Sequence, residues 1–125
     1  MKKVKVYVAG PFFTQAEERF MREVKEGLSG AGVEVEVRTP LDIGYVAGGS
    51  AEVFEADLRA IRECDTLVAI LDGHDAGTMC EIGYARALGK RIIGLWTDKE
   101  RRLDPFVRWL CDEVVTSLEE LRKKV

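Results

Sequence analysis

Residues 66–85, which read TLVAILDGHDAGTMCEIGYA, decide the fold. The unbroken apolar run at 66–71 is typical of a strand that is buried on both faces of a parallel sheet. A polar loop follows at 72–76, and the small and apolar residues at 77–88 predict a helix that Gly89 closes. This unit of strand, loop and helix predicts an α/β fold with its functional loops after the strands.

The same alternation continues on both sides of this segment. The patterning predicts strands at residues 3–9, 33–38, 66–71, 91–96 and, weakly, 113–116. It predicts helices at residues 14–30, 50–63 and 77–88, a short one at 105–110 and a last one from Ser117. The run at 33–38 has one polar face, so it is expected at a sheet edge. We therefore expect a single domain over residues 1–125 that is flavodoxin-like, doubly wound α/β, with a five-stranded, mainly parallel sheet and helices on both faces.

Three loops after strands, at residues 10–14, 39–50 and 72–77, are the expected ligand-binding region, because ligands of such sheets bind beyond the carboxyl ends of the strands. The stretch at 39–50 contains proline and several glycines and shows no period, so we expect a loop there, with Ser50 as the cap of the next helix. The glycine fingerprints of dinucleotide-binding and P-loop proteins are absent from the sequence.

Composition argues against several classes of protein. With 19 Lys and Arg against 22 Asp and Glu, the net charge is −3, which leaves no basic surplus for binding nucleic acid. No apolar run approaches the ~20 residues that span a bilayer. We therefore expect no membrane association and a soluble, cytoplasmic chain. The three cysteines form no CxxC pair, so buried thiols are expected in place of disulfides or a zinc site.

Asp57 interrupts the apolar face of the helix predicted at 50–63. Counting about 100° per residue, the apolar residues of this helix share one face, and Asp57 falls inside it. The other charged residues of the helix lie on the opposite face. Burying an unpaired carboxylate costs several kcal/mol. Asp57 is therefore either a ligand-binding carboxylate or a structural one, in a buried ion pair or capping a helix on a neighbouring loop.

Glu81 is the only charged residue in the segment 77–85, which is otherwise small or apolar and should be largely buried. Thr78 and Glu81 fit the capping-box spacing, in which a glutamate satisfies backbone N–H groups at a helix start. A functional role is compatible with this position, because a helix N-terminus lowers the pKa of a carboxylate and would keep Glu81 ionised, as a nucleophile requires. Asp75 is either functional or a turn or N-cap residue, and Asp72 is expected to be an exposed loop acid.

Several side chains near these acids leave alternatives open. Tyr7 in the first strand is either a core residue or a phenol that orients a carboxylate. Phe12 and Phe13 either pack against the first helix or form a stacking surface for a flat ligand. His74 is the only histidine, which weakens a metal site or a Ser-His-Asp triad. A thiolate dyad of Cys80 with His74 is a further alternative.

Taken together, these residues resemble one known family. The matching stretches are VYVAGPFF at 6–13, Asp57, DTLVAILDG at 65–73, DAGTMCEIGYA at 75–85 and LGK at 88–90. They look like the corresponding segments of nucleoside 2-deoxyribosyltransferases, and the likeness covers roughly residues 4 to 96. The run at 75–85, in its setting of strand, loop and helix, is its most specific part.

The resemblance implies a mechanism for named residues. Glu81 would attack the anomeric carbon of a 2-deoxyribonucleoside, displace the base and form a covalent deoxyribosyl-enzyme, which a second base then resolves with retention of configuration. Asp57 and Asp75 would hydrogen-bond and help to protonate the leaving base, and Tyr7 would position the nucleophile. Such chemistry needs one charged and one protonated carboxyl group, and an apolar pocket raises the pKa of the second. The substrate-binding residues would be Gly10, Phe12, Phe13, Gly77 and Met79.

Partners follow from the same resemblance. Nucleosides and nucleobases would be the small-molecule substrates, with no metal or organic cofactor. The family's transferases use a carboxy-terminal Asn from a neighbouring subunit to bind the 5-hydroxyl of the sugar, so a homodimer or higher homo-oligomer is implied. This chain contains no Asn, which leaves recognition of that end of the sugar unassigned.

Two other functions are considered. A related branch of the family hydrolyses deoxynucleoside 5-monophosphates and holds the phosphate with small hydroxyl residues, for which Ser50 and Ser117 are among the few serines of this chain. N-glycosidic hydrolysis of deoxynucleosides or their 5-monophosphates is thus the main alternative. The third function is a non-catalytic nucleotide-binding or signalling domain, in which Asp72 could be a phosphorylated residue, although the acidic pair that usually follows the first strand is replaced by Gly10 and Pro11.

Overall fold

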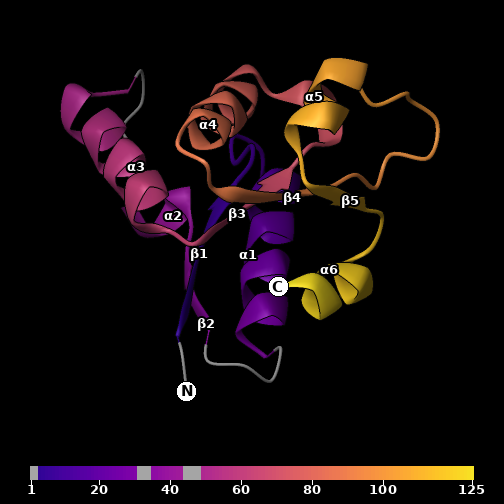
Figure 1. Ribbon diagram of the computed structural model, residues 1–125, viewed down its shortest axis with the longest axis horizontal. Coiled ribbons are helices and arrows are strands. Elements are labelled where there is room, and N and C mark those ends of the chain that lie inside the picture. Colours follow the sequence, from indigo (N-terminus) through magenta and orange to yellow (C-terminus); the bar gives the residue numbers. More distant parts are fainter. Residues whose placement is uncertain (1–2, 31–34, 44–48) are drawn as a thin grey trace.

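The computed structural model describes residues 3–30, 35–43 and 49–125, apart from the side chains of Val35, Leu41 and Ile43. Within these residues five strands form one sheet: β1 Val4–Ala9, β2 Val35–Arg38, β3 Thr66–Ile70, β4 Arg91–Leu95 and β5 Glu113–Val115. Their order is β2-β1-β3-β4-β5, and every neighbouring pair is parallel (Figure 1). The predicted flavodoxin-like, doubly wound sheet and the edge position of the second strand are confirmed.

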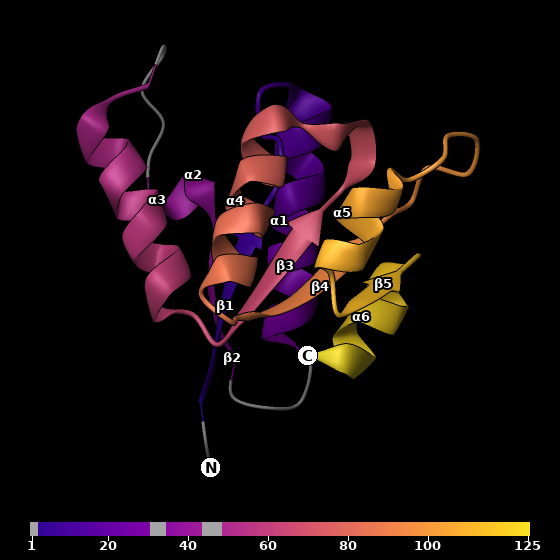
Figure 2. The same cartoon turned by 45° about the horizontal axis from the view of Figure 1, so that its top comes forward.

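Helices cover both faces of this sheet. The described helices are α1 Gln15–Ser29, α2 Pro40–Ile43, α3 Ala51–Glu63, α4 Ala76–Ala87, α5 Pro105–Leu110 and α6 Leu118–Lys124, with a 3-10 turn η1 at Asp72–His74. Buried side chains of α1 and α6 pack together on one face, and those of α3, α4 and α5 pack together on the other (Figures 1 and 2). None of the described helices is long and apolar enough to cross a membrane.

Alternation along β1 assigns its side chains to the two faces. Tyr7 and Ala9 belong to the apolar cluster under α3, α4 and α5, whereas Val6 and Val8 belong to the cluster under α1 and α6. Because successive side chains of a strand point to opposite faces, the pairing register directs Tyr7 toward α3 and α4. All five residues of β3 are buried, as the apolar run predicted.

Two predicted loops contain short elements. Within 39–50 the structure forms the helix α2, which was not predicted. A helix of one turn is too short to show a hydrophobic period in the sequence. Pro40 occupies its first position, where no N–H is needed. Asp42 Oδ2 accepts hydrogen bonds from Thr39 N (2.8 Å) and Thr39 Oγ1 (3.0 Å).

In the loop at 72–76 the structure forms η1. Residues 44–48 of the first loop and residues 33 and 34 of the second predicted strand lie outside the described residues.

Helix ends follow local sequence rules. The predicted cap at Ser50 is confirmed, since its hydroxyl accepts from Val53 N at 3.1 Å. Ser117 caps α6 in the same way. After α4, Gly89 has φ of +73°, a left-handed conformation that glycine adopts without strain. The prediction that Gly89 closes this helix is therefore confirmed.

Two glycines give opposite predictions for stability. A Cβ at Gly94 in β4 would lie 2.6 Å from Leu71 Cδ1 and 3.2 Å from Cys111 Sγ, so Gly94→Ala should destabilise the protein by about 1–3 kcal/mol. A Cβ at Gly83 in α4 would meet nothing within 4 Å, so Gly83→Ala should stabilise it by about 1 kcal/mol through helix propensity. Urea unfolding of the two variants and the wild type measures both effects. Equal midpoints for the two variants would contradict the close packing around Gly94.

Candidate active site

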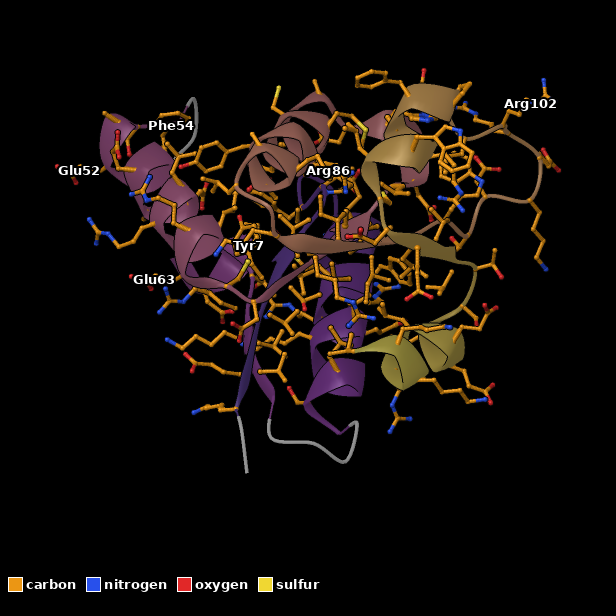
Figure 3. All side chains as sticks on the ribbon, in the orientation of Figure 1. Tyr7, Glu52, Phe54, Glu63, Arg86 and Arg102 are labelled. Carbon is orange, nitrogen blue, oxygen red and sulfur yellow. The ribbon has the colours of Figure 1, made fainter. Side chains whose placement is uncertain are left out.

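A cavity of about 570 Å³ lies beyond the carboxyl end of β1, between the amino-terminal half of α3 and the first turns of α4. This position is next to the point where the strand order reverses between β1 and β3, which is where ligands of such sheets bind. Figure 3 shows Phe54 near the amino end of α3, and it also labels Tyr7, which belongs to β1. The cavity is lined by Gly10, Phe12, Phe13, Phe54, Asp57, Leu58, Asp75, Gly77, Cys80, Glu81 and Tyr84.

A hydrogen bond from Tyr7, which does not itself line the cavity, holds Glu81 in the cavity wall. Tyr7 Oη donates to Glu81 Oε2 at 2.7 Å, and the tyrosine side chain is 1% exposed. The two residues come from β1 and α4, 74 positions apart in the sequence. Tyr7 therefore serves as a buried donor to the candidate carboxylate, in addition to its place in the core.

Burial sets the protonation of this pair. Burial raises the pKa of Glu81 to about 7; the bond from Tyr7 lowers it, and the negative charges of Asp57 and Asp75 raise it further. The pKa of Tyr7 is also raised, first by burial and then by the charge of Glu81, so the phenol keeps its proton and remains a donor. At neutral pH the carboxyl group of Glu81 is thus divided between its acid and ionised forms.

Two expectations about Glu81 were wrong. The helix begins one turn earlier than the capping-box interpretation requires, because Asp75 is the N-cap of α4 and Oδ2 of Asp75 accepts from Thr78 N (3.0 Å) and Thr78 Oγ1 (2.8 Å). Glu81 therefore lies in the second turn and contacts Tyr7 in place of backbone N–H groups. Its pKa is also raised, not lowered, because burial outweighs the hydrogen bond from Tyr7. The effect of the helix dipole falls off within the first turn, and Glu81 lies in the second. Asp75 does have the N-cap position that was one of its two interpretations.

Asp57 lines the opposite wall of the cavity on α3. Its Oδ1 atom is buried and has no hydrogen-bond partner among the described residues. Burial raises the pKa of this carboxyl group. Within the described part of the chain Asp57 forms neither an ion pair nor a helix cap, so the purely structural interpretations of this residue are not supported. A buried oxygen without a partner is suited to accept a hydrogen bond from a ligand.

Of the five predicted substrate-binding residues, four line this cavity. Phe12 and Phe13 stack on each other with ring centroids 5.1 Å apart, and both border the cavity, as do Gly10 and Gly77. Met79 does not. It packs against the apolar cluster on the far side of α4 and lines a second cavity of about 510 Å³. Met79 and Glu81 are two positions apart on α4, so their side chains differ in direction by about 200°, and Met79 points away from Glu81.

Sequence reasoning missed the lining residues Phe54, Leu58 and Tyr84, and it considered Cys80, which also lines the cavity, only as a thiolate paired with His74. Phe54 and Leu58 belong to the apolar stripe that made Asp57 conspicuous, and Tyr84 follows Glu81 by three positions on one helix face, so both signals were present. Cys80 is exposed, which corrects the expectation that all three thiols are buried; Cys64 and Cys111 are buried as expected.

Two other expectations near the site need correction. His74 does not pair with Cys80: its Nε2 accepts from Asp104 N at 3.0 Å, and its ring lies 5.1 Å from that of Trp96. Asp72 is not an exposed loop acid, because its carboxylate accepts hydrogen bonds from the backbone N–H (2.7 Å) and the hydroxyl of Thr97. No group of three or more potential metal ligands occurs among the described residues.

The raised pKa of Glu81 predicts a pH-dependent stability. A carboxyl group whose pKa is about 7 when folded and about 4.5 when unfolded stabilises the fold at low pH, and this contribution is lost as pH rises from about 4.5 to 7. Glu81→Gln removes the titration and keeps an acceptor for Tyr7. Relative to the wild type, the variant should therefore gain up to about 3 kcal/mol between pH 4 and pH 8.

Urea unfolding at both pH values measures this gain. Glu119→Gln on α6 is the control, since it removes a carboxylate that is 83% exposed and hydrated in both states. A difference between Glu81→Gln and wild type that stays constant from pH 4 to pH 8 would contradict the burial of Glu81.

Among curated proteins, an uncharacterized protein of Ureaplasma parvum serovar 3 is 31% identical over 104 residues, which are 73% of this chain and 65% of that protein. The chain thus spans less than two thirds of the length of this relative.

Solved structures share the fold over nearly the whole chain. A conserved protein from Enterococcus faecalis V583 has a TM-score of 0.87 and 26% identity, covering 98% of this chain and 96% of that one. A 2-deoxyribosyltransferase from Bacillus psychrosaccharolyticus has a TM-score of 0.82 and 24% identity, covering 95% and 90%. A CMP N-glycosidase from Clostridium botulinum has a TM-score of 0.65 and 24% identity, covering 96% of each chain.

A family model described as nucleoside 2-deoxyribosyltransferase matches residues 6–119, which include every described residue that lines the cavity. The match extends the resemblance seen in the sequence beyond residue 96 to β5 and the start of α6. The chain therefore belongs to the nucleoside 2-deoxyribosyltransferase family.

Proposed function

We propose that this protein transfers 2-deoxyribose from one nucleobase to another through a covalent intermediate on Glu81. The observation that carries the proposal is that a hydrogen bond from the buried Tyr7 holds Glu81 in the wall of a cavity with aromatic side chains. A carboxylate held by one donor keeps its other oxygen available for attack on carbon. Aromatic side chains such as Phe12 and Phe13 suit a flat nucleobase, and family membership supports the substrate class.

In the first half-reaction an oxygen of ionised Glu81 bonds to C1 of the sugar. The bond from C1 to the base nitrogen breaks, and its electron pair leaves with the base. The leaving base takes a proton from a second carboxyl group of the cavity, either Asp57 on α3 or Asp75 at the start of α4. Asp57 is favoured as this acid because burial raises its pKa, which keeps a proton on it at higher pH than an exposed aspartate.

In the second half-reaction a nitrogen of the incoming base attacks C1 and the bond from C1 to Glu81 breaks. The proton of the incoming base returns to the carboxylate that was deprotonated in the first step, so the enzyme is restored. Two displacements at the same carbon give retention of configuration. Tyr7 donates to Glu81 throughout, which stabilises the carboxylate as attacking group and again as leaving group.

Deoxynucleosides fit this cavity better than their 5-monophosphates. The described residues that line it include the carboxylates of Asp57, Asp75 and Glu81 and no lysine or arginine. A phosphate dianion would meet like charges there without a cation to hold it. Hydrolysis, in which water replaces the acceptor base, uses the same first half-reaction and is distinguished by its products. We include a homo-oligomer in the proposal, because the sites of the family it resembles are completed across a subunit interface. This chain contains no Asn, so the group that binds the 5-hydroxyl is unassigned.

Product analysis tests the acceptor. With deoxyinosine and free adenine, the protein should form deoxyadenosine and hypoxanthine, as measured by chromatography. Hypoxanthine release that is unchanged by adenine would instead indicate hydrolysis. Deoxyinosine 5-monophosphate should react at least tenfold more slowly than deoxyinosine, and the reverse preference would contradict the absence of a phosphate site.

Removal of the nucleophile tests the covalent step. Glu81→Ala should lose at least about a thousandfold in turnover, as expected when a nucleophile is removed, and should keep its fold by circular dichroism. Mass spectrometry of wild-type protein quenched with deoxyinosine should find one deoxyribosyl group on the peptide that contains Glu81. Glu119→Gln should match the wild type. Near wild-type turnover by Glu81→Ala would disprove the nucleophile assignment.

Asp57→Asn separates catalysis from stability. The substitution removes a carboxyl group whose Oδ1 is buried and has no hydrogen-bond partner among the described residues, so the protein should be as stable as the wild type or more stable. Turnover should fall by about 10²–10⁴-fold, the usual contribution of a general acid. Thermal unfolding and initial rates measure the two effects. Large destabilisation with nearly unchanged turnover would show a structural role for Asp57.

A further inference from the structure

Two helices face each other across the cavity and carry its carboxylates. Asp57 lies on α3 and Glu81 on α4, and Figures 1 and 2 both show these helices side by side. The negative charge of Asp57 is among the causes that raise the pKa of Glu81, so the two groups are electrostatically coupled. When both carboxyl groups are ionised, their like charges repel each other, which favours separation of α3 from α4. Attractive contacts between the helices must oppose this repulsion.

The core holds α3 mainly by its carboxyl-terminal half. Ala60 and Ile61 are buried there, at 4% and 0% exposure. In the amino-terminal half, Glu52, Glu55 and the 59% exposed Phe54 all face solvent. The part of α3 that carries Asp57 therefore has few core contacts of its own, and its distance from α4 depends on what holds the other half.

Two hydrogen bonds join α3 to α4 and the turn that follows it. Arg62 Nη1 donates to Tyr84 Oη at 3.1 Å, and Lys90 Nζ donates to the backbone carbonyl of Arg62 at 2.7 Å. Tyr84 follows Glu81 by three positions and Arg62 follows Leu58 by four, so each partner lies one helical turn beyond a residue of the cavity wall. The bond between Arg62 and Tyr84 thus spans the two helices directly beside the cavity.

We propose that Arg62 and Tyr84 form a brace that fixes the spacing of α3 and α4 and thereby positions Asp57 opposite Glu81 for the proposed transfer reaction. The inference rests on the proposed function and adds two positioning residues to it. The phenol oxygen of Tyr84 serves the brace, whereas its ring lines the cavity. The two roles can therefore be separated by substitution.

Kinetics of single and double variants test the brace. Tyr84→Phe keeps the ring and removes the acceptor, and Arg62→Met keeps an apolar stem and removes the donor. Each should lower kcat by about three- to tenfold, which corresponds to the net contribution of one exposed hydrogen bond, with a smaller change in KM. Because both remove the same bond, the double variant should fall no further than the single variants. Arg62→Lys, which retains a charged donor, should recover part of the loss.

A matched control is available on the same helix. Arg59→Met removes a guanidinium from α3 that has no hydrogen bond or ion pair among the described residues, and it should leave kcat unchanged. If Arg59→Met lowers kcat as much as Arg62→Met, loss of charge explains the effect and the brace is disproved. Additive losses in the double variant would also disprove it, because they would show that Arg62 and Tyr84 act separately.

Carboxyl NMR of the substrate-free protein gives a readout that needs no turnover. Glu81 faces Tyr7 on β1, Asp57 on α3 and Asp75 at the start of α4. Without the brace, Asp57 should move away and water should enter, and both changes lower the pKa of Glu81 from about 7. Tyr84→Phe should therefore shift the titration of Glu81, assigned by its loss in Glu81→Gln, to lower pH, whereas Arg59→Met should not.

The two kinds of failure are distinguishable. If the wild type converts no deoxynucleoside, the proposed function fails, and the titration still reports whether the brace controls the surroundings of Glu81. If the wild type is active but Tyr84→Phe alters neither kcat nor the titration of Glu81, the brace is disproved and the proposed function stands.

Discussion

The hydrogen bond from Tyr7 to Glu81 is the constraint on which the site depends. It joins β1 to α4, and it holds the carboxyl group of Glu81 in the wall of the cavity. Burial of that group is unfavourable when it is charged, and the phenol offsets part of the penalty by donating a hydrogen bond to the ionised form. The pair therefore combines a packing requirement, a buried tyrosine, with an electrostatic one.

The fold provides this contact through the geometry of a parallel sheet. Adjacent β1 and β3 end at the same edge, so the chain segments that follow them meet there. Alternation along β1 turns Tyr7 toward the helices α3 and α4, and the N-cap of Asp75 sets where α4 starts. Given that start, Glu81 falls in the second turn on the face that meets Tyr7. A helix begun at Thr78 would present a different face.

Charge distribution around the cavity is what the proposed chemistry uses. The cavity is lined by three acids, Asp57, Asp75 and Glu81, and by no basic side chain among the described residues. Such a group of acids cannot all ionise at low cost, so their environments separate their protonation states. The surroundings of the two acids differ: the buried Oδ1 of Asp57 has no hydrogen-bond partner among the described residues, whereas Oε2 of Glu81 accepts from the phenol of Tyr7. The same repulsion gives the contact between Arg62 and Tyr84 its proposed importance.

The sequence by itself determined the succession of strands and helices along the chain, the edge position of the second strand and the cap at Ser50. It also singled out the acids that line the cavity, Asp57, Asp75 and Glu81. Local periodicity and turn residues suffice for these features, because they depend on neighbours within a few positions. Asp57 was found because a charge within an apolar stripe is a local anomaly. Only the tertiary structure decided the environment of each group: the raised pKa of Glu81, the exposure of Cys80, the turning away of Met79 and the bond between Arg62 and Tyr84. These depend on contacts between residues far apart in the chain and on the position of a helix start, to which side-chain direction is sensitive by about 100° per residue.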